Sequence, residues 1–158
     1  MDSNFKFFTL FVMRGLPGSG KTTIAQSILG GNGVNKTVNN LAFIYCDQGV
    51  ICSSDFYSGH DKIQKSQKSV EFAMINKVPA IALDENNLTQ LEIGPFISLA
   101  NRHQYKVVVI EIPTASVTLC AENNTHGYNK EELIRMKGSW EKVNLPGTNG
   151  GLIKEETR

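Results

Sequence analysis

The chain has 158 residues, of which 41% are hydrophobic and 20% are charged. This composition supplies the core of one domain, at about 100–200 residues per domain, and excludes an intrinsically disordered chain. The net charge of +1 excludes the strongly basic composition of proteins that coat nucleic acid.

The cysteines and the apolar segments indicate the compartment. Cys46, Cys52 and Cys120 are odd in number and never occur at C-x-x-C spacing, so they predict neither a disulfide framework nor a zinc site. They favour a reducing, cytoplasmic compartment. The longest apolar run, residues 7–13, is interrupted by Thr9, is far shorter than the ~20 residues that cross a bilayer, and lacks a signal-peptide cleavage site. We therefore expect no membrane segment, with the oligomeric state left open.

Segments with strand and helix character alternate along the chain. Apolar runs typical of buried strands occur at 7–13, at 41–45 or 50–52, at 80–83 and at 106–112. Apolar residues at helical spacing occur between and after them, at 21–29, 61–77, 88–103, 116–120 and 130–143. Residues 32–40 read as a polar loop, and Gly94–Pro95 is expected to delay or kink the helix that contains it.

This alternation predicts a three-layer α/β fold. We expect a central parallel sheet of four to five strands with helices on both faces. The domain is expected over residues 1–145, followed by a flexible tail at 146–158 that contains three glycines and a charged end. In such folds ligands bind beyond the carboxyl ends of the strands.

Residues 15–22, GLPGSGKT, match the phosphate-loop motif G-x-x-x-x-G-K-[ST], between an expected strand and an expected helix. Gly18 and Gly20 allow backbone N–H groups to turn inward around a phosphate. Lys21 supplies a cation for the β- and γ-phosphates, and Thr22 a hydroxyl for Mg²⁺. The alternative is a turn that binds nothing, but a lysine and a hydroxyl at this place have no packing purpose. Nucleotide contacts are expected from Gly15, Leu16, Pro17, Gly18, Ser19, Gly20, Lys21, Thr22 and Thr23.

The sequence favours ATP as the nucleotide. Guanine recognition requires N-K-x-D, and both Asn35–Lys36 and Asn129–Lys130 lack the aspartate two positions beyond the lysine. The chain is also small for a motor ATPase with added domains. A compact P-loop kinase that uses ATP and Mg²⁺ is the natural class.

Two acids follow expected strands. Asp55 comes just after 50–52, where a carboxylate can accept the proton of an attacking hydroxyl; a helix cap or turn is the alternative. Asp84 ends the strand at 80–83, where an acid can hold Mg²⁺; turn chemistry is again the alternative. We favour a functional role for Asp84 because the polar residues that follow it would face the cleft.

Other polar residues carry weaker signals. Lys62, Lys65 and Lys68 recur every three residues on one expected helix. They could contact a polynucleotide backbone, but a solvated helix face is the simpler interpretation. The three histidines His60, His103 and His126 are isolated in sequence and predict neither a metal site nor a two-histidine phosphoesterase site.

Four motifs together resemble the polynucleotide 5′-hydroxyl kinase type of P-loop protein. They are RGLPGSGKTT at 14–23, ICSSDFY at 51–57, DENNLT at 84–89 and NTHGY at 124–128. The chain is particularly similar to the P-loop domain of 2′,3′-cyclic-nucleotide phosphodiesterases, over residues from about 7 to 140.

The resemblance implies a role for each matching position. Lys21 and Thr22 would hold ATP and Mg²⁺, and Asp55 would activate the 5′-hydroxyl of single-stranded RNA or DNA. Asp84 and Asn87 would match the motif at the end of the third strand, beside the catalytic cleft, and a small helical lid at about 116–137 would cover ATP. Candidate contacts to the acceptor are Asp55, Tyr57, Asn87, Lys62 and Lys65.

The sequence departs from this family in its basic residues. Family members commonly carry one shortly after the acid or in the lid, where this chain has Ser58 and residues 121–123, AEN. Arg135 and Lys137 are candidates to replace it, and Arg135 is our expected catalytic cation. A missing arginine finger can cost ~10³–10⁵-fold in phosphoryl transfer. We therefore expect an ATP-dependent polynucleotide kinase, with a catalytically weak ATP- and RNA-binding module or a small-metabolite kinase as alternatives.

Overall fold

A computed structural model describes residues 7–113, 116–143 and, as backbone, 151–154. Its strands are β1 (Thr9–Arg14), β2 (Val34–Val38), β3 (Leu41–Tyr45), β4 (Val50–Cys52), β5 (Ala80–Asp84), β6 (Lys106–Glu111) and β7 (Gly151–Lys154). Its helices are α1 (Lys21–Ile28), α2 (Lys62–Ile75), α3 (Gln90–Arg102), α4 (Val117–Asn123) and α5 (Lys130–Gly138), with a 3₁₀ turn, η1, at Ser54–Phe56.

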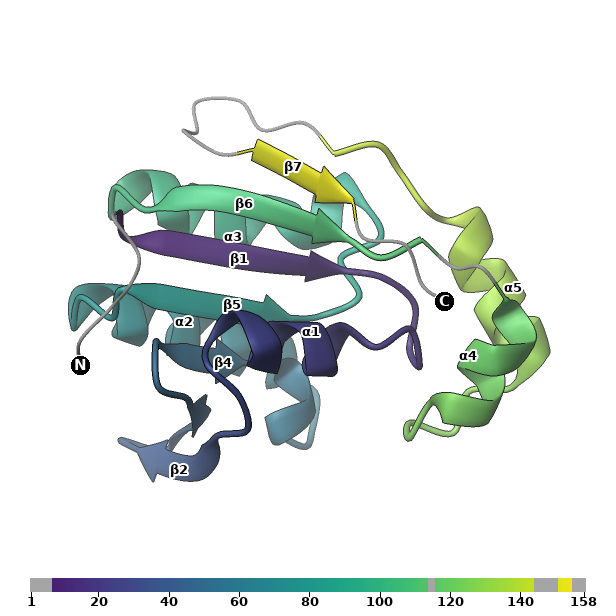
Figure 1. The fold of residues 1–158 in the computed structure, drawn as a ribbon, viewed down its shortest axis with the longest axis horizontal. Helices are drawn as coiled ribbons and strands as arrows, with labels where there is room; N and C mark the ends of the chain where they lie inside the picture. The colour runs from purple at the N-terminus through teal and green to yellow at the C-terminus, as the bar shows by residue number, and fades with distance from the viewer. Residues whose placement is uncertain (1–6, 114–115, 144–150, 155–158) are drawn as a thin grey trace.

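The strands form one sheet in the order β2-β3-β4-β5-β1-β6-β7 (Figure 1). Neighbouring strands from β4 to β7 are parallel, which confirms the predicted parallel sheet of up to five strands. β2 and β3 extend it as an antiparallel hairpin, so the whole sheet is mixed. Both candidates for the second strand, 41–45 and 50–52, are strands.

The hairpin corrects one prediction. Residues 32–40 do not form an irregular loop, because they contain β2, which pairs with β3 in the register Val38↔Leu41. Asn39 and Asn40 make the two-residue turn with φ of 52° and 62°, the left-handed region that Asn tolerates well. β2 has no apolar alternation because it is an exposed edge strand and buries neither face.

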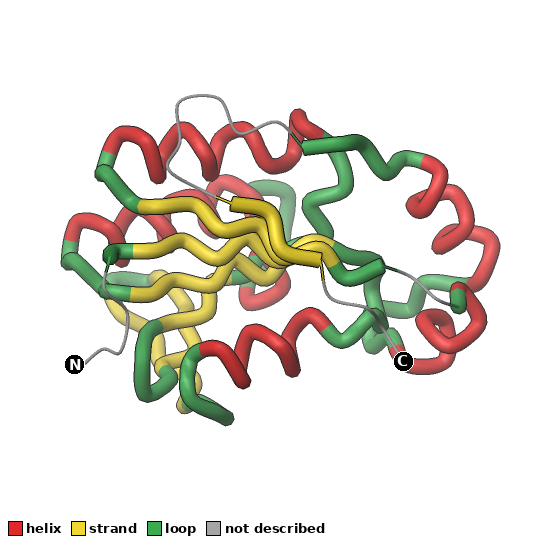
Figure 2. The backbone as a smooth tube through the Cα atoms, turned by 45° about the horizontal axis from the view of Figure 1, so that its top comes forward, coloured by secondary structure: helices red, strands yellow, loops and turns green. Residues whose placement is uncertain are grey.

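Helices cover both faces of the sheet, as expected (Figure 2). Every side chain of β1 is buried, and alternate residues serve different cores. Leu10 and Val12 pack in the core shared with α2 and α3. Phe11 and Met13 pack in the core shared with α1. A continuous apolar run therefore identifies a central strand in this chain.

The remaining helices lie at the predicted segments, but the helix predicted at 130–143 ends at Gly138 as α5. The predicted helix at 61–77 is α2, and the predicted helix at 88–103 is α3, which continues through Pro95. The Thr89 hydroxyl accepts a hydrogen bond from the Glu92 amide and fixes the start of α3. Of the predicted tail at 146–158, only 151–154 lies within the described residues, where the backbone forms β7 beside β6; the flexibility of the tail stays a prediction.

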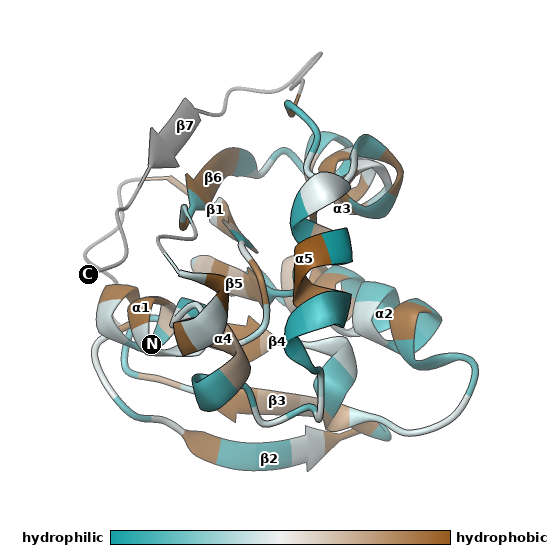
Figure 3. Ribbon diagram, turned by 90° about the vertical axis from the view of Figure 1, so that its right-hand side faces the viewer, coloured by the Kyte–Doolittle hydropathy of each residue, from teal (hydrophilic) through white to brown (hydrophobic). Residues whose placement is uncertain are grey.

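The helices α4 and α5 form a separate small layer at the carboxyl ends of the parallel strands (Figure 3). They lie within the segment at about 116–137 where a lid over ATP is expected, and we refer to them as the lid helices; the covering role stays a prediction. A compact core of its own joins the lid to the phosphate loop and contains Leu16, Leu88, Cys120 and Leu133. The lid helices are therefore packed on the phosphate loop.

Arg14 joins β1 to the base of the lid. Its side chain is completely buried, and its guanidinium lies 4.2 Å from the centre of the Trp140 ring. It donates to the backbone oxygens of Asn87 (2.6 Å), Leu88 (2.7 Å) and Glu141 and to the Glu111 carboxylate (2.8 Å). One side chain thus connects three separate segments immediately before the phosphate loop.

None of the helices within the described ranges has the length and apolar character required to span a bilayer.

Candidate active site

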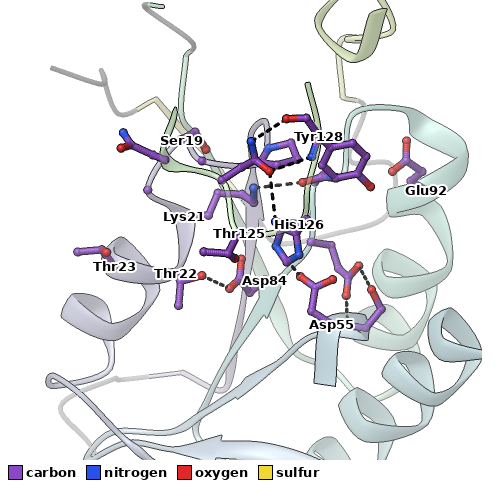
Figure 4. A pocket seen from close by; sticks show the side chains of 18 of the residues that line it. Ser19, Lys21, Thr22, Thr23, Asp55, Asp84, Glu92, Thr125, His126 and Tyr128 are labelled. Carbon is purple, nitrogen blue, oxygen red and sulfur yellow. Dashed lines mark hydrogen bonds and ion pairs between the residues drawn. The ribbon is translucent and has the colours of Figure 1, made fainter. Parts of the chain in front are cut away.

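A cavity of 830 Å³ lies at the carboxyl ends of the central strands, between the phosphate loop, α2 and the lid (Figure 4). The loop supplies residues 17–23 to its wall. The other lining residues include Ser54, Asp55, Lys62, Ile63, Asp84, Glu85, Asn86, Glu92, His126 and Tyr128. This is the place where open α/β sheets bind their ligands.

The phosphate loop has an open, polar interior. Gly20 has a φ of +97°, and a Cβ built on it would meet no atom within 4 Å. Ser19 is 4% exposed, and its hydroxyl has no hydrogen-bond partner among the described residues. A buried hydroxyl without a partner costs stability, so it fits a loop whose donors serve a bound anion. The amino end of α1, beginning at Lys21, adds a partial positive charge. These features fit the phosphates of a nucleotide.

Lys21 is buried beside the loop. Its Nζ donates to the Leu16 carbonyl at 2.9 Å and to Asn86 Oδ1 at 3.2 Å. Burial lowers the pKa of Lys21, and the charges of Asp84 and Asp55 oppose this shift. A bound polyphosphate would add further negative charge at this ammonium.

Thr22 and Asp84 meet across the loop. The Thr22 hydroxyl, in the first turn of α1, donates to Asp84 Oδ2 at 2.5 Å. Burial raises the pKa of Asp84, whereas the Thr22 hydrogen bond and the Lys21 charge lower it. Hydroxyl and carboxylate oxygens suit Mg²⁺, which usually takes one or two protein ligands and completes its shell with phosphate and water. The two residues therefore fit a magnesium ion.

Asp55 lies on η1, across the cavity from the loop. Its amide donates to the Ser53 hydroxyl at 3.1 Å, and its carboxylate is about half exposed. Asp55 Oδ2 is 3.4 Å from His126 Nε2 (Figure 4). An exposed carboxylate on a fixed turn can receive a proton from a substrate hydroxyl.

His126 is a site residue that sequence reasoning missed. It lies in the loop between α4 and α5, which Asn124 organises. The Asn124 Nδ2 donates to the carbonyls of Ala121 (2.9 Å) and Tyr128 (3.0 Å), and its Oδ1 accepts from the His126 and Tyr128 amides. The signal was the NTHGY motif, but no spacing in the sequence relates a lid histidine to Asp55.

Some of the residues predicted to contact the phosphoryl acceptor line the cavity and others lie outside it. Lys62 lines the cavity. The Tyr57 hydroxyl instead accepts from the Ala42 amide at 2.8 Å and bonds to Ser69. Lys65 lies over the Tyr57 ring at 5.8 Å, outside the cavity wall. Tyr57 therefore ties η1 to β3 and α2.

Asn87 and Arg135 also lie outside the cavity. Asn87 is 1% exposed, has a φ of 52°, and donates from Nδ2 to the Met13 carbonyl at 2.8 Å. It therefore ties the turn after β5 to β1. Arg135 is exposed on α5 and is absent from the cavity wall. The basic side chains of the described wall are Lys21, Lys62 and His126.

Comparison with known proteins identifies the family of this chain. Residues 10–135 match the family model described as an AAA domain. The chain belongs to this family. Its fold is that of the P-loop kinases, as its phosphate loop predicts.

Two curated relatives align with nearly all of this AAA domain. The 2′,3′-cyclic-nucleotide 3′-phosphodiesterase of Rattus norvegicus is 28% identical over 152 residues, which are 94% of this chain and 35% of the rat protein. The NEDD4-binding protein 2 of Homo sapiens is 29% identical over 151 residues, 93% of this chain and 8% of the human protein. The chain thus spans about a third or less of these relatives. The first agrees with the resemblance inferred from the sequence motifs.

Solved kinase structures share the fold of this AAA domain. A gluconokinase from Sinorhizobium meliloti superposes with a TM-score of 0.55 at 11% identity, covering 97% of this chain and 85% of the other. A sugar kinase from a Janibacter species superposes with a TM-score of 0.51 at 16% identity, covering 92% and 84%. Likeness at these identities establishes the architecture alone.

The buried carboxyl of Asp84 makes a prediction about pH. Because the folded state raises the pKa of Asp84, it holds that proton more tightly than the unfolded chain does. This stabilisation is fully present below the unfolded pKa and is lost as the pH rises through the folded pKa. We therefore expect Asp84→Asn to melt a few degrees above the wild type at pH 7 without nucleotide.

Thermal melts from about pH 4 to pH 8 check this prediction, since an unperturbed Asp titrates near 3.9. The difference between Asp84→Asn and wild type should shrink toward the acidic end. Magnesium ATP should stabilise the variant less than the wild type. A constant difference at every pH would contradict the assignment.

Proposed function

We propose that this AAA domain transfers the γ-phosphoryl group of ATP to a hydroxyl, with the 5′-hydroxyl of RNA or DNA as the first candidate acceptor. The observation that carries the proposal is one cavity with two chemically distinct walls. The phosphate loop, Lys21 and Thr22 form the first wall, and Asp55 with Lys62 forms the second.

Each wall has a task in the reaction. The loop amides and Lys21 hold the polyphosphate, and Thr22 and Asp84 would hold Mg²⁺, which neutralises charge on the phosphate oxygens when it is bound. Asp55 accepts the proton of the acceptor hydroxyl while that oxygen forms a bond to the γ-phosphorus. The bond to the β–γ bridging oxygen breaks, and ADP leaves with its electron pair.

The first candidate acceptor is supported by the sequence motifs and by the curated relatives. The name of the rat relative refers to cyclic nucleotides, so a nucleotide-derived acceptor is a consistent hypothesis for this chain. Lys62 lies on the acceptor wall, where it could pair with the first internucleotide phosphate.

A small uncharged polyol is the second candidate acceptor. The acceptor wall carries Asp55, Glu85 and Glu92 against one lysine, Lys62. A surplus of carboxylates disfavours a polyanion, whereas it can accept hydrogen bonds from several hydroxyls. The same fold occurs in proteins named as a gluconokinase and a sugar kinase.

Phosphoryl transfer from labelled ATP tests the proposal. The protein is incubated with magnesium ATP and either a 5′-hydroxyl oligonucleotide or a panel of polyols, beside a known kinase as positive control. Label on the oligonucleotide, lost when Lys21 is replaced by alanine, supports the first candidate. Label only on a polyol supports the second. No label on any acceptor, together with no calorimetric heat from magnesium ATP, would refute the function.

The missing lid arginine makes a further prediction. If the site lacks a cation near the γ-phosphate, Asn123→Arg should raise the turnover of the wild type about tenfold or more, because an arginine finger contributes ~10³–10⁵-fold when ideally placed. Asn123 lines the cavity at the end of α4. Leu119→Arg, on the same helix but outside the wall, is the matched control. Equal turnover in both variants would count against a catalytically weak module.

A further inference from the structure

The residue after Asp84 holds the turn that carries Asp55. Glu85 follows the metal-site acid directly, but the two side chains contact different segments. Asp84 accepts from Thr22 of α1, whereas Glu85 accepts from Ser54, the first residue of η1. Asp84, the last residue of β5, and Glu85, which follows it, thus contact opposite walls of the cavity.

The contact between Glu85 and Ser54 has two bonds. Glu85 Oε1 accepts from the Ser54 backbone amide, and Glu85 Oε2 accepts from the Ser54 hydroxyl at 2.8 Å. Two bonds to one residue fix the turn in rotation as well as in position. A third donor, the Ser66 hydroxyl of α2, approaches Glu85 Oε1 at 3.4 Å.

This contact is buried beneath an accessible acid. Ser54 is 5% exposed, whereas the Asp55 carboxylate is 49% exposed. Burial raises the pKa of Glu85, and the two Ser54 hydrogen bonds lower it. Three donors, the Ser54 amide, the Ser54 hydroxyl and the Ser66 hydroxyl, lie at the Glu85 carboxylate, whereas the neighbouring charges of Asp55 and Asp84 raise its pKa.

We propose that Glu85 is a positioning residue that holds Asp55 in register with the phosphate loop by fixing Ser54. This inference rests on the proposed function, because it assigns Glu85 to the geometry of the same transfer. Glu85 itself exchanges no proton with the acceptor and binds no metal. Since Glu85 directly follows Asp84, the last residue of β5, the acid that faces Thr22 and the support of the base are covalently linked neighbours.

The test combines kinetics with amide hydrogen exchange. Glu85→Ala should lower kcat about 10²-fold, because a displacement of about 1 Å can cost that much, while the KM for ATP changes less than about twofold. In the nucleotide-free protein, the amides of 54–57 should exchange faster. Glu85→Gln keeps one acceptor oxygen and should give intermediate values in both measurements. Glu71→Ala removes a carboxylate of α2 that pairs with Arg102 and His103 outside the cavity wall, and it should change neither quantity.

A double-mutant cycle tests the route through Ser54. Ser54→Ala should lower kcat in the wild type but cost little more in the Glu85→Ala background, because coupled residues are not additive. Additive effects would show that Glu85 acts independently of Ser54 and would overturn the proposal. An increase in the acceptor KM at constant kcat would also overturn it, since that marks a direct substrate contact.

The two proposals fail in different ways. If the wild type phosphorylates no acceptor, the proposed function fails, yet exchange at 54–57 still decides whether Glu85 fixes the turn. Unchanged exchange in Glu85→Gln and Glu85→Ala overturns the positioning role whatever the activity. If Glu85→Ala unfolds, shown by faster exchange throughout the chain, Glu85→Gln alone decides the outcome.

Discussion

Replacing Asp55 with asparagine is expected to lower phosphoryl transfer about 10²–10⁴-fold, which is the usual contribution of a general base. Asparagine has nearly the same shape, but its amide cannot take up the proton of the acceptor hydroxyl. ATP affinity should change less than about twofold, because the phosphate loop and Lys21 form the opposite wall of the cavity. Label transfer and calorimetry on the same preparation measure the two effects separately.

Asp61→Asn is the matched control for that experiment. Asp61 is an exposed carboxylate beside α2, lies outside the cavity wall, and pairs only weakly with Lys65 at 3.7 Å. Its replacement should leave transfer and ATP affinity at wild-type values. If Asp55→Asn and Asp61→Asn were equally active, Asp55 could not be the base.

Replacing Arg14 with methionine is expected to cost about 3–5 kcal/mol of stability, the range found when one partner of a buried ion pair is removed. The substitution leaves the Glu111 carboxylate, 2.8 Å from Arg14 Nη1, buried without its partner. It also removes a donor from the carbonyls of Asn87, Leu88 and Glu141, of which the Leu88 carbonyl still accepts from the Glu141 amide. At ~2–4 °C per kcal/mol for a chain of this size, the melting temperature should fall by about 6–20 °C.

Two further variants test whether the loss of stability comes from the buried ion pair of Arg14 or from replacing any paired arginine. Arg102 pairs with Glu71 at 3.0 Å, but its side chain is 62% exposed, so Arg102→Met should cost no more than about 1 kcal/mol. Adding Glu111→Leu to Arg14→Met should recover part of the loss, because it removes the buried charge. Equal melting of Arg14→Met and Arg102→Met would contradict the role of Arg14 as a buried connector.

The fold and the nucleotide half of the site could be predicted because their signals are local. The run from Phe7 to Met13 identifies a central strand by composition, since both of its faces are buried. The phosphate loop has its glycines, lysine and threonine within eight consecutive residues. Asp84 follows directly on an apolar strand, so its place at the cavity needs no knowledge of distant contacts.

Features that depend on tertiary contacts escaped prediction. β2 buries neither face, so its sequence lacks the alternation by which an edge strand is recognised. Asn87 was expected beside the acceptor, but its positive φ reverses the chain and brings its amide under β1. His126 meets Asp55 only because the loop between α4 and α5 reaches the cavity. Arg14 becomes a connector only when three remote segments converge on it.

Gly18 has a consequence for the speed of nucleotide exchange. A Cβ placed there would lie 2.2 Å from the Cys120 carbonyl oxygen, so the loop backbone rests almost directly on the backbone of α4. We therefore expect a small displacement of α4 to move the phosphate loop as well. We also expect the separation of these two main chains to limit the rates at which ATP binds and leaves, so that side-chain changes on the outer surface of α4 alter both rates and leave their ratio nearly constant.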